Sequence, residues 1–169
     1  MSNVSQFTGL GWVPLETKEI TTPSFTVDFS TNIDDTFNNY VVTSTNTLST
    51  TTATIYGKLK TGGVAITTGY RSLATYPGTT TSSTASNASF ALITGYQGSF
   101  VTYFMNLRSS EPFKSINTQS TGYSSTSLVL RDYNSCLLST SLIDGIEFSL
   151  SSGTFNSGKF TLYGIRELQ

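Results

Sequence analysis

The apolar residues of this chain alternate with polar ones in short runs, and this period of two restricts the fold more than any other feature. Residues 145–165, GIEFSLSSGTFNSGKFTLYGI, show the alternation twice, on either side of a polar loop. Alternation of this kind gives a β-strand one apolar face. No stretch of about 12 residues sustains the 3.6-residue period of an amphipathic helix. The chain is therefore predicted to be all-β, and residues 145–165 to form two strands joined as a hairpin.

Further strand-like runs follow at short intervals from residue 24. Two of the intervals, TGG at 61–63 and QGS at 97–99, contain the glycine that is typical of hairpin turns. A succession of short strands with short turns predicts an antiparallel β-sandwich of the jelly-roll type. The expected strands cover residues 24–30, 40–47, 52–60, 64–73, 88–96, 100–107, 114–121, 127–134, 142–150 and 158–166.

Residues 1–22 show neither the helical nor the strand period. We expect them to form an extended N-terminal docking arm rather than a strand of the main sheet, followed by one jelly-roll domain over residues 23–169. Trp is enriched among the residues that dominate protein–protein interfaces. The candidate partner-binding residues are the apolar side chains of the arm: Phe7, Leu10, Trp12, Val13 and Leu15.

The surface is expected to be covered with hydroxyl groups rather than charges. Charged residues make up 11% of the chain, well below the roughly 25% of an average soluble domain. Counting along the sequence gives 26 Ser and 30 Thr, while 11 Phe and 9 Tyr argue against disorder. The net charge is -1, and the basic residues are scattered. Nucleic acid is therefore not an expected partner.

Residues that carry catalysis are scarce. The chain has no His and a single Cys, Cys136, so that Ser-His-Asp, Cys-His and disulfide arrangements are excluded. Calcium at the NIDD sequence, 32–35, is one alternative, but adjacent carboxylates in a turn commonly bond to the backbone instead. We expect no enzyme activity, no metal and no cofactor. A carboxylate pair for glycoside hydrolysis would come from Asp34, Asp35, Glu111, Asp132, Asp144 and Glu147.

Tyrosines at loops offer an alternative chemistry, the stacking of aromatic rings on sugars. Tyr76 and Tyr123 flank loops, and we expect them to be the most exposed of the tyrosines. They are therefore the candidate glycan contacts. The sequence has no basic n-region followed by an apolar run, and no apolar stretch of about 18 residues. We expect a protein that is made and kept in a cytoplasm, or that leaves it by a route other than secretion, such as lysis, and that has no membrane partner.

The closing segment IDGIEFSLSSGTFNSGKFTLYGI, residues 143–165, resembles the C-terminal signature of small jelly-roll virion surface proteins of tailed bacteriophages. The order TTGYRSLATY, Ser/Thr-rich loop, SFALITG is also similar to that group. On physical grounds Gly158 is expected to permit the turn, Phe160 and Leu162 to fill the core, and Gly164 to allow a close backbone approach.

The resemblance implies a non-enzymatic structural protein on the virion surface. The expected function is that of a head decoration, or cement, protein that binds the major capsid protein or another virion protein. We expect a homo-oligomer, with a trimer suited to the symmetry axes of a shell. The alternative is a tail-fibre or receptor-binding component that recognises host-surface glycan.

Overall fold

The computed structural model describes residues 11–76, 79–83, 90–124 and 127–166, with the backbone only between 73 and 96 and at residue 124. These residues form an 11-stranded antiparallel sheet. The described residues contain no helix, and therefore no helix that is long and apolar enough to cross a membrane. The prediction of an all-β, antiparallel chain is confirmed. The strands are β1 (Trp12–Ile20), β2 (Thr26–Phe29), β3 (Asn39–Thr61), β4 (Val64–Ala65), β5 (Tyr70–Tyr76), β6 (Thr79–Ser83), β7 (Phe90–Met105), β8 (Phe113–Ser124), β9 (Ser127–Leu138), β10 (Gly145–Leu150) and β11 (Phe155–Ile165).

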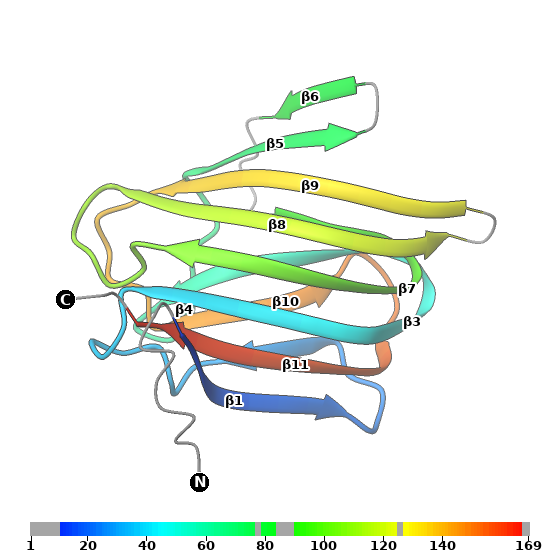
Figure 1. The fold of residues 1–169 in the computed structure, drawn as a ribbon, viewed down its shortest axis with the longest axis horizontal. Coiled ribbons are helices and arrows are strands. Elements are labelled where there is room, and N and C mark those ends of the chain that lie inside the picture. The colour runs from blue at the N-terminus through cyan, green and yellow to red at the C-terminus, as the bar shows by residue number, and fades with distance from the viewer. Residues whose placement is uncertain (1–10, 77–78, 84–89, 125–126, 167–169) are drawn as a thin grey trace, which may run out of the picture.

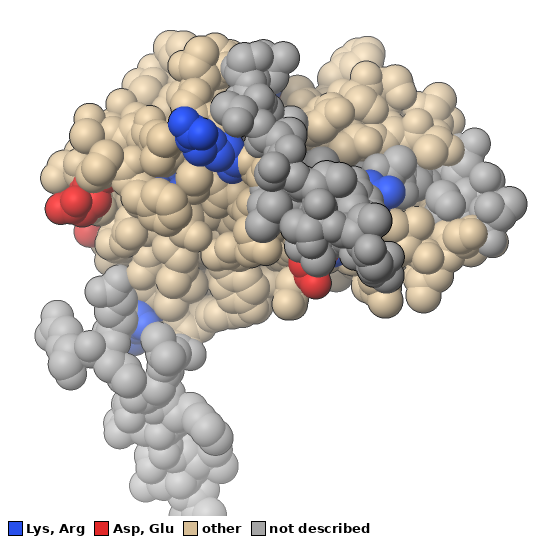
Figure 2. Space-filling model, turned by 90° about the horizontal axis from the view of Figure 1, so that it is seen from above, with Lys and Arg blue, Asp and Glu red and all other residues tan. Residues whose placement is uncertain are grey.

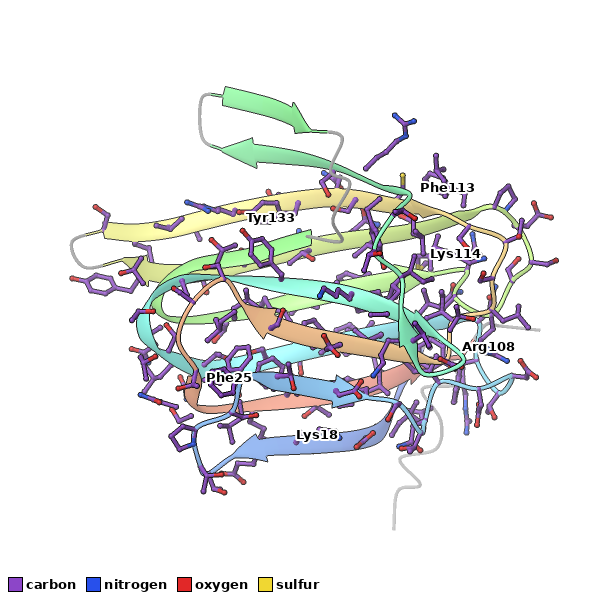
Figure 3. All side chains as sticks on the ribbon, turned by 180° about the vertical axis from the view of Figure 1, so that it is seen from behind. Lys18, Phe25, Arg108, Phe113, Lys114 and Tyr133 are labelled. Carbon is purple, nitrogen blue, oxygen red and sulfur yellow. The ribbon has the colours of Figure 1, made fainter. Side chains whose placement is uncertain are left out.

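The main path of the sheet runs β1-β11-β3-β7-β8-β9-β5-β6. Figure 1 shows β1 at one edge of this path and β5 with β6 at the other. β7, β8 and β9 follow one another as antiparallel neighbours. β10 and β4 pair with β3, and β2 pairs with β10. In Figure 1, β10 lies behind β3 and β11, and in Figure 3, seen from behind, it lies in front of them. We call the face of the main path that points away from β10 the outer face, and the opposite one the inner face.

The long strand β3 connects the main path of the sheet with β10, which lies outside that path. Its first half pairs with β11, and its second half, from Ile55 to Lys60, pairs with β10. Its register against β7 shifts between Leu48 and Ala53, and the strand curves round at the right of Figure 1. Since β10 and β11 pair with β3 and not with each other, the prediction of a closing hairpin is wrong.

The core lies between β10 and the main path of the sheet. Phe148 of β10 packs against Phe160 of β11 and Phe100 of β7, with ring centroids 5.7 and 5.6 Å apart. Phe29 of β2 meets the same Phe148 edge-on at 6.4 Å. All four rings are buried. The alternating apolar residues of the closing segment therefore face one another across the core.

The two predicted hairpin turns have different outcomes. At TGG, Lys60 pairs with Ala65 and Thr61 with Val64, so this hairpin is confirmed. At QGS the prediction is wrong, because β7 continues without a break and Gly98 pairs with both Thr47 and Gly122. A glycine inside a strand often marks a bulge rather than a turn. Here β3, opposite Gly98, carries the register shift.

The expectation that residues 1–22 contain no strand of the main sheet is wrong for Trp12–Ile20. These residues form β1, which pairs with β11 from Trp12 to Ile20. Ile20 is buried, and Leu15 packs against the core. The irregular spacing of apolar residues has a physical cause, since the register shifts between Pro14 and Glu16 and reverses which residues face inward.

Most residues of the closing segment, 143–165, have the structural roles that the sequence predicts. Phe160 and Leu162 are fully buried. A Cβ on Gly164 would overlap the Phe37 ring, so a close approach at this glycine is confirmed, and it is made by a side chain. Gly158 is not in a turn: it lies inside β11 with φ at +140°, next to the Thr47 backbone, where the β3 register shifts.

Candidate functional site

The acidic candidates of the sequence are mostly engaged in local structure. Asp34 accepts a hydrogen bond from the Thr36 backbone N–H at 2.9 Å, and this bond lowers the pKa of Asp34. Asp35 binds the Arg108 guanidinium, with Nε 2.9 Å from Oδ1. Asp144 accepts the Gly62 N–H in the β3–β4 turn. Among the residues with described side chains, no three His, Cys, Asp or Glu residues cluster as metal ligands.

The predicted arm residues are divided by the structure. Phe7 and Leu10 lie outside the described residues. Val13 and Leu15 are partly buried in β1, and Leu15 packs on the chain's own core. Trp12 remains 43% exposed at the start of β1.

Trp12 belongs to a row of apolar side chains across one end of the sheet's outer face, which we call the apolar belt. Its indole lies 5.5 Å from the Tyr163 ring and 5.9 Å from the Tyr103 ring. Tyr103 and Met105 share a face of β7, because they are two residues apart. The belt comprises Trp12, Tyr163, Tyr103, Met105, Phe113 and Leu138.

The far half of the belt is on β8 and β9. Phe113 pairs directly with Leu138 and is the diagonal neighbour of Met105, which pairs with Ser115. Met105, Phe113 and Leu138 are 36%, 49% and 48% exposed. The belt thus reaches from β1 to β9 along one end of the molecule, where Figure 3 labels Phe113.

Lys114 fixes the outward orientation of Phe113. Neighbouring residues of a strand point to opposite faces, and the Lys114 side chain is fully buried on the inner one. Its ammonium donates to the carbonyl oxygens of Glu111, at 2.7 Å, and Ser109. Burial lowers the pKa of Lys114. The inward Lys114 therefore holds the preceding loop and leaves Phe113 on the outer face.

A groove of about 770 Å³ crosses the same outer face further along the strands. It spans β3, β7, β8 and β9, which lie side by side in Figure 1. Each strand contributes three consecutive residues, of which the middle one directs its side chain inward and contributes backbone to the floor. The inward residues are Ser44, Phe100, Ser120 and Arg131.

Two rows of outward side chains form the groove walls. Their strand register aligns them directly, as in Val101–Gln119–Asp132 and Ser99–Thr121–Leu130. The first row is Thr43, Val101, Gln119 and Asp132, and the second is Thr45, Ser99, Thr121 and Leu130.

The groove walls are almost uncharged. Asp132 is their one ionic side chain, because Arg131 points inward and donates from its guanidinium to the Tyr133 hydroxyl at 3.0 Å. The side of the molecule that is seen from above in Figure 2 is also poor in charge, with small separate patches of Lys, Arg, Asp and Glu.

Of the two tyrosine candidates, Tyr123 is placed beside the groove. It lies two residues beyond Thr121 on the same face of β8, is 52% exposed, and pairs with the exposed Leu128. Its predicted exposure is confirmed. Tyr76 ends β5, and its side chain lies outside the described part of the structure.

Sequence reasoning missed the groove for two reasons. Gln119 stands between Thr118 and Ser120, so the sequence shows no apolar alternation at this position that would reveal its face. Alternation also gives no lateral alignment of separate strands. No known protein-family model matches the chain, and no curated protein matches it either.

Proposed function

We propose that this protein is a non-enzymatic structural protein of a virion, a head decoration protein that binds the outer capsid surface as an oligomer. The jelly-roll type of its fold is part of the same proposal. The observation that carries it is the apolar belt, a contiguous row of exposed and half-buried apolar side chains. Contiguous exposed apolar residues with a polar surround are characteristic of interaction sites.

The belt has the composition of an interface centre. Aromatic residues and Met are enriched there and charged residues are depleted, and the belt contains four aromatic rings, one Met and one Leu. Each of the Trp12, Phe113 and Leu138 side chains would gain about 25 cal/mol for every Å² of apolar surface buried on a partner. The partner is the major capsid protein or another virion protein.

This proposal moves the attachment surface from the predicted arm to the sheet. Trp12 keeps the role expected of it, whereas Val13 and Leu15 face the chain's own sheet. A trimer would place three belts on one shell axis and multiply their weak individual contacts. The same proposal places the protein on the virion surface, made in the host cytoplasm and released by lysis.

The first experiment is the copy number of the protein in purified virions, measured by quantitative mass spectrometry against the major capsid protein. A number comparable with that of the capsid protein supports a shell component. A copy number as low as that of tail proteins, or absence from the particle, contradicts the decoration proposal.

The second experiment tests the belt with virion heads that lack the protein. We expect Phe113→Ser to weaken rebinding at least about tenfold, since truncation of a central aromatic commonly costs more than 1.4 kcal/mol. Phe25→Ser is the matched control, because Phe25 is 74% exposed and lies away from the belt (Figure 3). Equal rebinding of both variants contradicts the role of the belt.

The alternative, a tail-fibre component that recognises host-surface glycan, is favoured by the groove with Tyr123 at its side. A copy number as low as that of tail proteins, together with glycan binding, would establish the tail-fibre function instead of the decoration function.

A further inference from the structure

We infer that the groove across β3, β7, β8 and β9 is a binding site for a neutral carbohydrate chain. This inference goes beyond the decoration function and does not depend on it, because the belt and the groove use different residues. The argument rests on the shape of the groove, on its hydrogen-bonding groups and on its lack of positive charge.

The shape suits an elongated ligand. Crossing four neighbouring strands gives a length of about 14 Å, from a strand spacing of roughly 4.8 Å. The volume of about 770 Å³ lies within the range of roughly 300–1,000 Å³ common for small-molecule sites. A short oligosaccharide laid across the strands fits these dimensions.

The chemistry of the walls favours a polyhydroxyl ligand. Thr and Ser hydroxyls both donate and accept, and so does the Gln119 amide, which matches sugar hydroxyls with the same double capacity. The Asp132 carboxylate can accept from two hydroxyls at once. Leu130, 54% exposed, and Val101 supply apolar surface for the C–H faces of a sugar.

Tyr123 extends the site beyond the second wall. Thr121 forms part of that wall, and Tyr123 follows it on the same face of β8. An exposed tyrosine ring offers an apolar face for stacking with its hydroxyl in water. A sugar that leaves the groove at this side would pass over the Tyr123 ring.

Other ligand classes fit less well. A polyanion such as nucleic acid would meet the Asp132 carboxylate, and no Lys or Arg side chain in the walls would offset it. A peptide that adds a β-strand needs a free sheet edge. Along the groove β3, β7 and β8 pair with neighbours on both sides, and the pairing of β9 with β5 reaches Asp132. Recognition therefore depends on side chains, and these suit a neutral glycan.

The test is an NMR titration of the full ¹⁵N-labelled chain. The probes are neutral oligosaccharides of glucose, galactose, mannose and their N-acetylated forms, with heparin as the polyanionic probe. We expect at least one neutral probe to shift the amides of β3, β7, β8 and β9 beside the groove. No shift of these amides by any neutral probe, or shifts by heparin alone, would overturn the proposal.

Variants identify the residues. Gln119→Ala and Asp132→Ala are each expected to raise the Kd of the bound probe about tenfold, the effect of losing one hydrogen bond to a sugar of about 1.4 kcal/mol. Tyr123→Ala should raise it about twofold to twelvefold, the equivalent of the roughly 0.5–1.5 kcal/mol typical of a ring contact. The dispersion of each variant's spectrum verifies its fold.

The matched control is Asn134→Ala, which removes an exposed polar side chain from β9 on the same face, two residues from Asp132 but outside the groove walls. Its Kd should equal that of the unmodified chain. Equal effects of Asn134→Ala and Asp132→Ala would overturn the assignment of the site to the groove.

Discussion

At the scale of single residues, Lys60 shows how a sheet poor in charge uses the few charges it has. Its ammonium lies 2.8 Å from Asp28 of β2 and 3.9 Å from Glu147 of β10, and so connects three strands. The hydrogen bond with the Asp28 carboxylate is the main reason why the pKa of Lys60 is raised. The side chain is only 12% exposed, so solvent screens the pair weakly.

We predict that Lys60→Met lowers the free energy of unfolding by about 2 kcal/mol near neutral pH, the scale of a hydrogen bond between charged groups. Because the folded pKa of Lys60 lies above its ordinary value of 10.5, its stabilisation is fully present below pH 10.5 and is lost as the pH rises through the folded pKa. Urea unfolding of both chains from pH 7 to strongly alkaline pH measures the difference. A difference that vanishes already below pH 9.5 would contradict this assignment.

Gly164 is a residue whose missing side chain determines the packing. We predict that Gly164→Ala lowers the free energy of unfolding by about 1–3 kcal/mol, the usual range for overpacking, because the new methyl group would overlap the Phe37 ring. Thermal and urea unfolding measure the loss. In the background of Phe37→Ala, which opens space at this position, the same substitution should cost far less. Additive effects of the two substitutions would show that Phe37 is not the obstacle.

At the scale of elements, alternation predicted where strands occur but not how they pair. The apolar faces of residues 145–150 and 158–165 were evident because a period of two is a local property. Their neighbours were not evident, since pairing depends on contacts between β3 and strands distant from it in sequence. The groove could not be predicted for the same reason, because Gln119 and Asp132 become neighbours only through the β8–β9 register.

The bulge in β1 hid this strand from the sequence pattern, although the strand belongs to the sheet. We predict that removing residues 1–20 destabilises the chain by about 2–5 kcal/mol. The core loses the buried Ile20, worth roughly 1.5–3 kcal/mol, and the smaller contribution of the partly buried Leu15. The loss also leaves β11 as an open edge that favours self-association. Urea unfolding and light scattering measure both effects. An unchanged unfolding midpoint would mean that β1 adds nothing to the stability of the sheet.

At the scale of the whole molecule, the outer face carries two surfaces of different chemistry. The belt at one end is apolar, whereas the groove combines hydroxyls, an amide and a carboxylate with the apolar side chains of Val101 and Leu130. On β8 the residues Ser115 and Asn117 separate them, and Phe113 lies about 20 Å from Gln119 at roughly 3.3 Å per residue. On β7 the two surfaces adjoin, because Tyr103 of the belt and Val101 of the groove are two residues apart on the same face. The part of the groove on β8 and β9 can therefore remain open to solvent while the chain attaches through Phe113 and Leu138.

This separation predicts independent effects on the two activities. Substitutions more than about 10 Å apart without shared partners usually act additively, so Phe113→Ser should weaken rebinding to virion heads and leave the Kd for the carbohydrate probe unchanged. Asp132→Ala should do the reverse, and the double variant should show both losses undiminished. Rebinding assays and NMR titrations of the three variants measure this. Loss of carbohydrate binding in Phe113→Ser would mean that the belt and the groove form one continuous surface, which a capsid partner would cover.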